Sequence, residues 1–173
     1  IVRLAMKPPP LDIVVSKKIN KKEIEQFKTL VSGEQILPNV IRCNLNENIE
    51  NLPRFSDGIW WIQDVASQIS CNLLLSKIKT YFSKPVNSIK ILDLCCAPGG
   101  KTAQLLDNKL NVVSIEKSKL RSETFKKNME RLNFNPELIN ANAENYIPSF
   151  KADVILIDAP CSATGTIRKN PDI

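Results

Sequence analysis

One stretch decides the fold class of this chain: Ile89-Lys90-Ile91-Leu92-Asp93-Leu94-Cys95-Cys96-Ala97-Pro98-Gly99-Gly100-Lys101-Thr102. Its first residues are almost wholly apolar, which is typical of a parallel strand that is covered on both faces. The glycine pair then turns the chain into a predicted helix over residues 100–108. A strand, a glycine turn and a helix in this order bring backbone N–H groups close to a ligand. The stretch therefore indicates an open α/β sheet with a ligand site at the turn.

The same alternation of strands and helices continues on both sides of this stretch. The predicted strands cover residues 88–94, 111–115, 137–141 and 153–157, and the predicted helices cover residues 64–82, 100–108 and 118–132. Strands that alternate with helices at this spacing predict β-α-β units. We expect an α/β fold with a doubly wound, Rossmann-like parallel sheet. The strand over residues 153–157 is as apolar as that over 88–94, so both are expected to be covered on both faces.

The helix over residues 64–82 shows a helical spacing of apolar residues. Its predicted buried face consists of Val65, Ile69, Leu73, Leu74 and Leu75.

Residues 1 to 57 carry a thinner apolar pattern, which predicts a small α+β subdomain before the parallel sheet. Strands are expected over residues 11–15 and 40–45. A helix is expected over residues 20–31, because Asn20 is a good N-cap and Glu23 stands where it completes a capping box. We therefore divide the chain into residues 1–57 and residues 58–173.

The composition excludes several classes of site and compartment. The 173 residues include no histidine, which excludes a Ser-His-Asp triad and a histidine metal site. The five cysteines are an odd number and none form a C-x-x-C pair, so we expect no metal site and free thiols. Free thiols, no signal peptide and no long apolar run indicate a cytoplasmic protein without a membrane segment. Lys and Arg number 24 against 18 Asp and Glu, a net charge of +6.

The glycine turn is compatible with three classes of ligand, which the neighbouring residues separate. A P-loop would need a glycine where Cys95 stands, and a dinucleotide site would need more glycines than the pair Gly99-Gly100. S-adenosylmethionine needs only a bend, space beside it and an acid at the end of the next strand for the ribose hydroxyls. Glu116 stands at that position. The alternative is a plain turn and a solvated strand end.

A second reactive segment follows the last predicted strand. Asp158-Ala159-Pro160-Cys161 lies at the carboxyl end of that strand, where open parallel sheets bind their ligands. An acid and a thiol there suit methylation of cytosine at C5: a thiolate adds to C6, and an acid near N3 supports the adduct. The target base must leave its stack for this chemistry. The alternative is a buried cysteine that behaves as a small apolar residue.

Two motifs closely resemble those of the Sun-type (RsmB) RNA cytosine-C5 methyltransferases, which modify small-subunit ribosomal RNA in bacteria. They are residues 93–102, Asp-Leu-Cys-Cys-Ala-Pro-Gly-Gly-Lys-Thr, and residues 158–165, Asp-Ala-Pro-Cys-Ser-Ala-Thr-Gly. Residues 8–12, 58–64 and 166–172 look like further parts of the same family pattern. The resemblance implies S-adenosylmethionine as cofactor, ribosomal RNA as partner, and an RNA-contacting role for the first subdomain.

The resemblance also implies roles for individual residues. Asp158 would lie between cofactor and cytosine, and it is expected with Cys161 to be catalytic. Glu116 would hold the ribose, and Asn142 stands where the family places an acid for the adenine, with Glu144 as the alternative. The residues expected to line the cofactor are Cys95, Cys96, Ala97, Pro98, Gly99, Gly100 and Lys101.

The chain departs from the family pattern at its ends. In the family, the attacking cysteine lies in a later Thr-Cys-Ser motif, and the cysteine that corresponds to Cys161 assists product release. Neither that motif nor the family's helical amino-terminal domain occurs in these residues. We therefore expect a piece of the enzyme, with a sheet truncated at its carboxyl end, that does not methylate RNA alone. The rival expectation is that Cys161 itself attacks C6.

Two basic groups of residues are candidate RNA contacts. One follows Glu116 and comprises Lys117, Lys119, Arg121, Lys126, Lys127 and Arg131. The other comprises Lys17, Lys18, Lys21 and Lys22. For the first group, a solvated helix face is the explanation that we favour. Trp60 and Trp61 suit base stacking or, as we expect, core packing. The remaining alternatives for the whole chain are a degenerate member that binds without turnover and a nicotinamide-dependent dehydrogenase.

Overall fold

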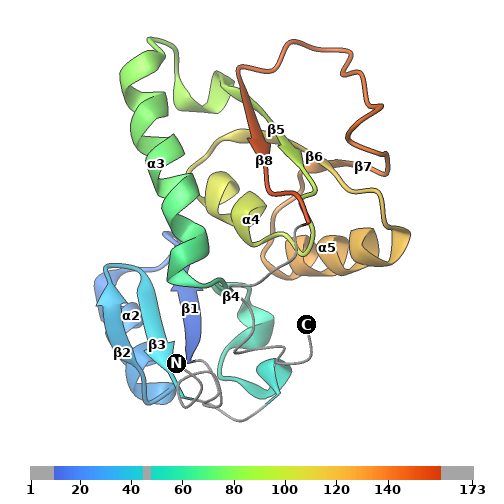
Figure 1. Ribbon diagram of the computed structural model, residues 1–173. Helices are drawn as coiled ribbons and strands as arrows, with labels where there is room; N and C mark the ends of the chain where they lie inside the picture. The colour runs from blue at the N-terminus through green and yellow to red at the C-terminus, as the bar shows by residue number, and fades with distance from the viewer. Residues whose placement is uncertain (1–9, 45–47, 161–173) are drawn as a thin grey trace, which may run out of the picture.

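The computed structural model describes residues 10–44 and 48–160, arranged around two sheets (Figure 1). The first sheet has the strand order β2-β3-β1-β4 and is antiparallel, and the second has the order β7-β6-β5-β8 and is parallel. Cys161 and the segment 166–172 lie outside the described residues, as do Pro8 and Pro9. The parallel sheet that the sequence predicts is confirmed.

The first sheet and its helix form the amino-terminal part of the chain. Its elements are β1 (Leu11–Val15), α2 (Lys21–Leu30), β2 (Glu34–Leu37), β3 (Val40–Cys43), the short 3-10 helices η1 (Ile49–Asn51) and η2 (Phe55–Asp57), and β4 (Trp60–Ile62).

The predicted start of α2 is confirmed in detail. Asn20 Oδ1 accepts from Glu23 N at 3.1 Å, and Glu23 Oε2 accepts from Asn20 N at 2.9 Å. The strand β2 was not predicted, because most of its side chains are exposed and leave no apolar alternation to read. The strand β4 pairs with β1, so the first sheet extends through Ile62, past the boundary expected after residue 57.

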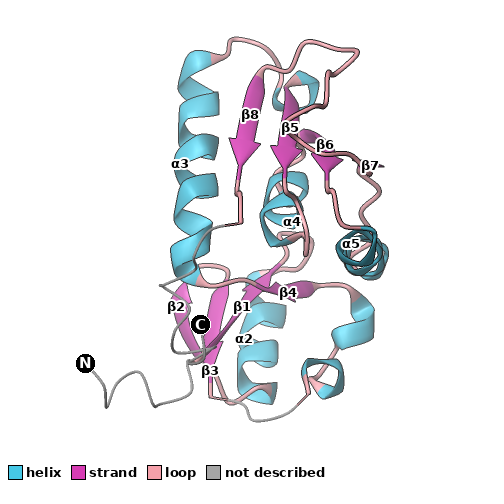
Figure 2. Ribbon diagram, turned by 45° about the vertical axis from the view of Figure 1, so that its right-hand side comes forward, coloured by secondary structure: helices cyan, strands magenta, loops and turns pink. Residues whose placement is uncertain are grey.

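The second sheet carries the elements that the glycine stretch organises. They are α3 (Val65–Tyr81), η3 (Val86–Ser88), β5 (Lys90–Leu94), α4 (Gly100–Asp107), β6 (Asn111–Ile115), α5 (Lys119–Arg131), β7 (Glu137–Ile139) and β8 (Val154–Ile157). Figure 2 shows α3 beside β8 and α4 close to β5. None of the helices among the described residues is long and apolar enough to cross a membrane.

One face of the parallel sheet packs against helices. Ile91 of β5 and Val112 of β6 are buried together with Cys71 and Ile78 of α3 and Leu105 of α4. Further along, α4 and α5 share a second cluster with Trp61, in which Ala103 and Phe125 are also buried. Trp60 and Trp61 are both buried, so the expected core packing of this pair is confirmed.

The opposite face of the parallel sheet is covered differently. Leu92 of β5 and Val113 of β6 point to this face, where they contact apolar side chains of the segment after β7, such as Tyr146 and Phe150. Within the described residues no helix packs on this face, so the helices of a doubly wound sheet are seen on one face only.

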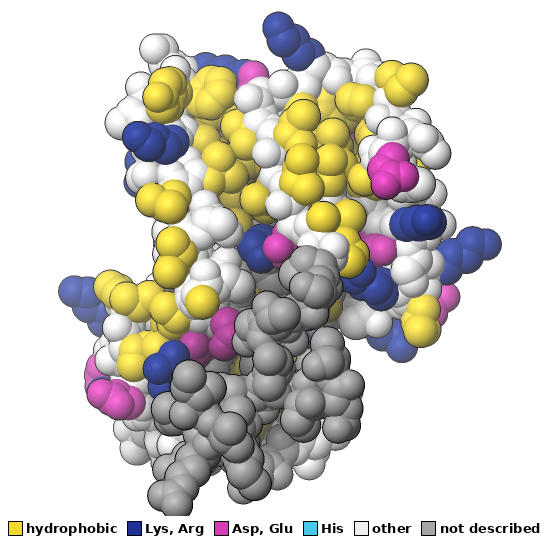
Figure 3. All heavy atoms as spheres, in the orientation of Figure 1, with side chains coloured by type: hydrophobic (Ala, Val, Ile, Leu, Met, Phe, Trp, Pro, Cys, Tyr) yellow, Lys and Arg dark blue, Asp and Glu magenta, His cyan; other side chains and the backbone are white. Residues whose placement is uncertain are grey.

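The expectation that β8 is covered on both faces is wrong. Ile155 is 57% exposed and Ile157 is 66% exposed, whereas Leu156 packs against the cluster under α3. The reason is position: β8 is the last strand of the sheet within the described residues, and nothing there covers its outer face. Figure 3 shows the resulting apolar surface on the face of the molecule where β8 and β5 lie.

The predicted face of α3 is also wrong in part. The helix buries Gln68, Cys71 and Ile78, while Ile69 and Leu73 are more than half exposed. The buried residues follow helical spacing, but Gln68 is polar and Ile69 is apolar, so apolar periodicity selected a neighbouring face.

Gln68 belongs to a chain of buried amides that joins the two sheets. Trp61 Nε1 donates to Gln63 Oε1 at 2.9 Å, and Gln63 Nε2 donates to Gln104 Oε1 at 2.9 Å. Gln104 Nε2 in turn donates to Asn72 Oδ1 at 2.8 Å, and Gln68 Nε2 donates to Gln63 O at 3.0 Å. The amide chain thus connects β4 of the first sheet with α3 and α4.

Candidate functional site

The loop between β5 and α4 is shaped by two residues in the left-handed region. Cys95 has φ +62° and Gly99 has φ +109°. The φ of Gly99 is one that residues with a side chain rarely adopt, which explains why glycine stands there, and a Cβ would also lie 2.7 Å from Met129 Cε. Cys96 N donates to Ile115 O at 3.1 Å, so the loop stays attached to β6 as it leaves the sheet.

A cavity of about 790 Å³ lies beyond the carboxyl ends of β5, β6 and β8. This volume is in the range of small-molecule sites. Its walls come from the ends of these strands and from the segments that follow them: Leu94, Cys95, Ile115, Glu116, Lys117, Ser118, Arg121, Ala141, Asn142, Ala143, Glu144, Ile157, Ala159 and Pro160. We call it the strand-end cavity.

Glu116 is the buried acid of the strand-end cavity. Its residue is 3% exposed, and Oε1 accepts from Ser118 N at 2.9 Å. Oε2 accepts no hydrogen bond from any described residue, although Arg121 Nη1 lies 3.6 Å away. A buried carboxylate oxygen without a donor is costly, and a ligand hydroxyl in the cavity would satisfy it.

Arg121 is a site residue that the sequence analysis placed only on a basic helix face. Its Nη2 donates to Ala97 O, and its Nη1 lies near Glu116. The side chain therefore ties the first turn of α5 to the glycine loop and to the buried acid. The signal available in the sequence is its position three residues after the N-cap Ser118, which directs the side chain back toward the strand end.

Asn142 and Glu144 both line the strand-end cavity and contact each other. Asn142 Nδ2 donates to Glu144 Oε2 at 3.4 Å, and Glu144 N donates to Asn142 Oδ1 at 3.3 Å. The structure therefore brings both candidates for the adenine contact to the same wall, opposite the loop.

The predicted cofactor-loop residues divide between neighbouring cavities. Cys95 lines the strand-end cavity and also a smaller cavity of about 210 Å³, which Asp158 shares. Cys96, Ala97, Pro98, Gly100 and Lys101 line only the smaller of these two. Gly99 lines neither and faces α5 instead. Their contact with a cofactor stays a prediction.

Lys101 and Asp158, two predicted site residues, form an ion pair. Lys101 Nζ lies 2.5 Å from Asp158 Oδ2; the lysine side chain is 15% exposed and the carboxylate 56%. The pair joins the first turn of α4 to the segment after β8. It holds the Asp158 carboxylate at the wall of the smaller cavity.

Asp93 lies beneath this ion pair. Thr102 Oγ1 donates to Asp93 Oδ2 at 2.6 Å, and Oδ1 has no hydrogen-bond partner among the described residues. Burial raises the pKa of Asp93 to about 6, the Thr102 hydrogen bond opposes this, and the nearby Asp158 charge adds to it.

The described thiols are poor nucleophiles. Burial raises the pKa of Cys71 to about 11, and it raises the pKa of Cys96 further, with Asp93 and Glu116 adding to the effect. Burial, and after it the charge of Glu116, also raises the pKa of Cys95. A reactive thiolate is therefore not found among the described cysteines. Within residues 10–44 and 48–160, no three His, Cys, Asp or Glu side chains group closely enough to hold a metal ion.

Only some of the basic residues on and before α5 are exposed and without structural partners among the described residues. Arg131 Nη1 donates to Phe55 O at 3.0 Å, and its guanidinium lies 4.3 Å from the Phe55 ring centroid. Burial lowers the pKa of Arg131. Arg121 and Arg131 thus have structural partners, whereas Lys117, Lys119, Lys126 and Lys127 are exposed.

Comparison with known proteins places this geometry in a family. The family described as "16S rRNA methyltransferase RsmB/F" matches residues 80–173. "Ribosomal RNA small subunit methyltransferase B" of Proteus mirabilis is 34% identical over 177 residues, covering 95% of this chain and 39% of that protein. The protein of the same name from Sodalis glossinidius is 33% identical and covers 95% and 38%. The chain thus spans about 39% of the length of these relatives.

Solved structures share the fold. The crystal structure of PH0851 superimposes with a TM-score of 0.79 at 26% identity, covering 98% of this chain and 39% of that one. NSun6 from Pyrococcus horikoshii superimposes with a TM-score of 0.73 at 19% identity, covering 93% and 66%. Both matches span the antiparallel sheet together with the parallel one.

Proposed function

Because the chain belongs to the RsmB/F family of 16S rRNA methyltransferases, we propose that it serves S-adenosylmethionine-dependent methylation of cytosine C5 in small-subunit ribosomal RNA. The observation that carries the proposal is the strand-end cavity with Glu116 in its wall. Its volume suits a nucleoside cofactor, and Glu116 Oε2, which accepts no hydrogen bond from a described residue, suits ribose hydroxyl donors.

The residues of the cavity divide the work of holding the cofactor. Glu116 would accept hydrogen bonds from the ribose, and Asn142 or Glu144 would accept one from the adenine amine. Cys95 lies where the two cavities meet and would contact the part of the cofactor between ribose and sulfonium. When bound, S-adenosylmethionine supplies an electrophilic methyl group. The crystal structure of PH0851 supports the same fold around the site.

The chemistry on cytosine falls to the segment after β8. A thiolate that adds to C6 makes C5 nucleophilic; C5 then gains the methyl group, loses its proton to a base, and the thiol leaves. Asp158 would face N3 of the pyrimidine, held in place by Lys101. Cys161, which lies outside the described residues, follows Pro160 directly, and we propose that it assists product release, whereas the thiol that attacks C6 is expected in the family's later Thr-Cys-Ser motif.

Calorimetric titration of the chain with S-adenosylmethionine, S-adenosylhomocysteine and NAD tests the cofactor. We expect the first two to bind and NAD not to bind. Loss of a buried hydrogen-bond partner costs about 1–3 kcal/mol, so Glu116→Ala should weaken binding roughly ten- to a hundred-fold. Glu137→Ala, at the far end of the same sheet, is the matched control and should bind as the parent does. Equal affinity of Glu116→Ala and the parent would refute the ribose assignment.

A chain that binds cofactor or RNA without turnover is the alternative function. Transfer of a labelled methyl group to unmodified small-subunit ribosomal RNA distinguishes the two. Turnover that disappears in Cys161→Ser supports catalysis through this thiol. Because this chain is not expected to methylate RNA alone, cofactor binding without transfer supports the alternative only where a chain extended through the Thr-Cys-Ser motif also fails to transfer the methyl group. The match to the methyltransferase family argues against the nicotinamide-dependent dehydrogenase, which was the other enzyme class considered from the sequence.

A further inference from the structure

A separate cavity lies at the other end of α4 from the glycine loop. Its volume is about 460 Å³, and it shares no lining residue with the strand-end cavity. The eight residues of α4 begin in the glycine loop and end at Asp107, on the wall of this cavity. A helix of that length spans about 12 Å, so the cavity is remote from the proposed methyl transfer. We call it the α4-end cavity.

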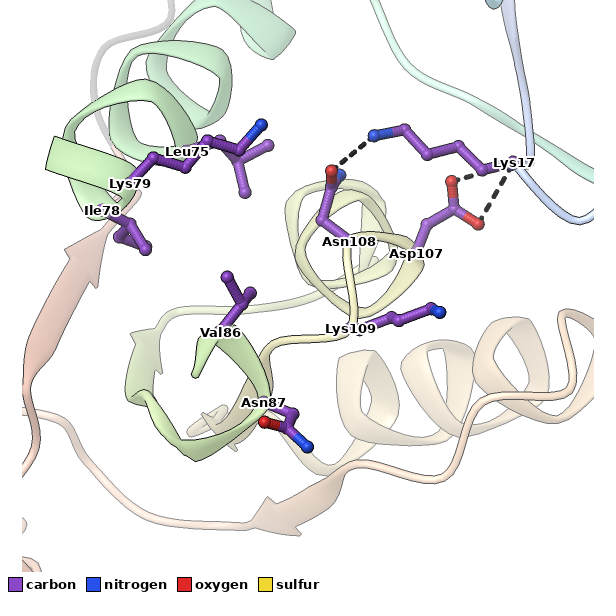
Figure 4. Close-up of a pocket in the computed structure, with 9 residues that line it drawn as sticks. All are labelled: Lys17, Leu75, Ile78, Lys79, Val86, Asn87, Asp107, Asn108 and Lys109. Carbon is purple, nitrogen blue, oxygen red and sulfur yellow. Dashed lines mark hydrogen bonds between the residues drawn. The ribbon is translucent and has the colours of Figure 1, made fainter. Parts of the chain in front are cut away.

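The floor of the α4-end cavity is apolar. Leu75 and Ile78 enter it from α3, and Val86 enters it from η3 (Figure 4). Ile78 is buried, while Leu75 and Val86 are partly exposed. Such a floor accommodates the flat or apolar part of a ligand without a specific hydrogen bond.

The rim of the α4-end cavity is basic. Lys17, from the segment after β1, and Lys79, from α3, extend toward each other from opposite sides (Figure 4). Lys17 Nζ donates to Asn108 Oδ1 at 2.5 Å, a neutral partner. Lys109 completes the set of three lysines. None of the ion pairs between described residues involves any of the three.

Both carboxylate oxygens of the one acid on the wall, Asp107, already accept hydrogen bonds. Asp107 Oδ1 accepts from Ser16 Oγ at 2.5 Å, and Oδ2 accepts from Lys17 N at 3.0 Å. Three lysines and one aspartate give the lining a net charge of +2. Lysines beside the carboxyl end of a helix stabilise its dipole, which accounts for Lys109. Lys79, in the last turn of α3, stabilises the dipole of its own helix in the same way. Lys17 comes from the segment after β1 and lies in no helix, so this effect does not account for it.

The geometry points to a second RNA-contact site in the α4-end cavity, which takes one phosphate-bearing nucleotide of the ribosomal RNA away from the reacting cytosine. The inference rests on the proposed function, because it requires an RNA substrate. Lys17 and Lys79 bracket the phosphate, and the sugar and base lie against Leu75, Ile78 and Val86. Contacts of this kind fix the register of the RNA and do not read its sequence.

The test measures binding of unmodified small-subunit ribosomal RNA, transcribed in vitro, at several salt concentrations. The variant Lys17→Gln/Lys79→Gln should bind about ten-fold more weakly near 0.1 M salt. Its salt slope should fall by roughly 0.7 for each lysine lost, as expected for single-stranded contacts. The control Lys77→Gln/Lys151→Gln removes the same charge from exposed positions outside the cavity and should change affinity less than two-fold.

The outcomes separate this inference from the proposed function. Binding of S-adenosylmethionine should be equal in the parent and both variants, which shows that the fold and the strand-end cavity are intact. Equal losses in the two double variants would overturn the α4-end site and leave RNA binding as a general charge effect. Binding of adenosine monophosphate alone that depends on Lys17 and Lys79, with RNA affinity unchanged, would overturn it in favour of a small-ligand site. RNA bound by no variant or parent would overturn the RNA substrate itself.

Discussion

The Thr102 hydroxyl donates to Asp93 Oδ2 at 2.6 Å, directly beneath the glycine loop. It is the one hydrogen bond from a described residue to the Asp93 carboxylate, and the residue is 1% exposed. A carboxyl group in this setting is more easily protonated in the folded chain than in the unfolded one, because burial disfavours its charged form.

We therefore expect Asp93 to make stability depend on pH between about 4 and 6. Its pKa is raised from 3.8 to about 6 on folding, so in this window the folded chain holds a proton that the unfolded chain has lost. The free energy of unfolding then falls as pH rises, by up to about 3 kcal/mol. Asp93→Asn should remove this slope in urea unfolding measured from pH 4 to 7.

Asp153→Asn is the control for the pH dependence. Hydrogen bonds from Lys84 and from Lys90 N lower the pKa of Asp153, so its contribution is lost only below the window. The slope between pH 4 and 6 should therefore persist in this variant. If the unfolding free energy still falls between pH 4 and 6 in Asp93→Asn, Asp93 is not the cause of the pH dependence.

The adjacent glycines of the loop should differ sharply in their tolerance of alanine. Gly99 has φ +109°, and a Cβ there would meet Met129 Cε and Phe125 Cδ2 at 2.7 and 3.1 Å. A Cβ on Gly100 would lie 3.5 Å from its nearest neighbour, Gln63 Cγ. We expect Gly99→Ala to lower the free energy of unfolding by about 1–3 kcal/mol and Gly100→Ala to change it by less than about 0.5. Equal effects in thermal unfolding would contradict this.

Asn142→Asp should tighten binding of S-adenosylmethionine. The substitution removes the donor to Glu144 Oε2 but keeps the acceptor for Glu144 N–H, and it offers the adenine amine a charged acceptor. The expected gain is about 1 kcal/mol, roughly five-fold in Kd by calorimetry. Glu144→Gln is the control and should bind no more tightly than the parent. A weaker complex with Asn142→Asp would assign the adenine to Glu144.

Neighbouring residues of β8 should respond oppositely to lysine. Ile155 is more than half exposed, so we expect the parent to associate at high concentration through this face. Ile155→Lys should reduce that association and change the unfolding free energy by less than about 0.5 kcal/mol. Leu156 packs against the cluster under α3, so Leu156→Lys should cost about 2 kcal/mol or more. Light scattering and urea unfolding measure the two effects. Association unaltered in Ile155→Lys would show that the exposed face of β8 is not responsible for it.

The sequence was sufficient to predict the parallel sheet and the position of the glycine loop. Both depend on local signals: apolar strands, a turn that needs glycine, and the Asn20 cap of α2. The location of Glu116 beside the glycine loop could be predicted from its place at the end of a strand, because parallel strands end at a common edge of the sheet.

Relations between segments distant in the chain were not predictable in the same way. The contact of Arg121 with the glycine loop depends on how α5 packs: its position after the N-cap Ser118 gives the direction of the side chain but not its partner. The burial of Gln68 depends on amide partners from other elements, which apolar periodicity ignores. The exposure of Ile155 depends on strand order. An apolar strand has the same sequence pattern whether it lies at the centre of a sheet or at its end, so the pattern does not predict this exposure.

The amide chain between the sheets makes their association an all-or-none event. Each link uses a donor of one residue and an acceptor of the next, from Trp61 through Gln63 and Gln104 to Asn72. Reversing one amide would set two donors or two acceptors against each other, so the chain has a single direction. Separating β4 from α4 would leave several buried polar groups without hydrogen-bond partners at once. The position of the helix that follows the glycine loop is therefore tied to that of the first sheet through these hydrogen bonds.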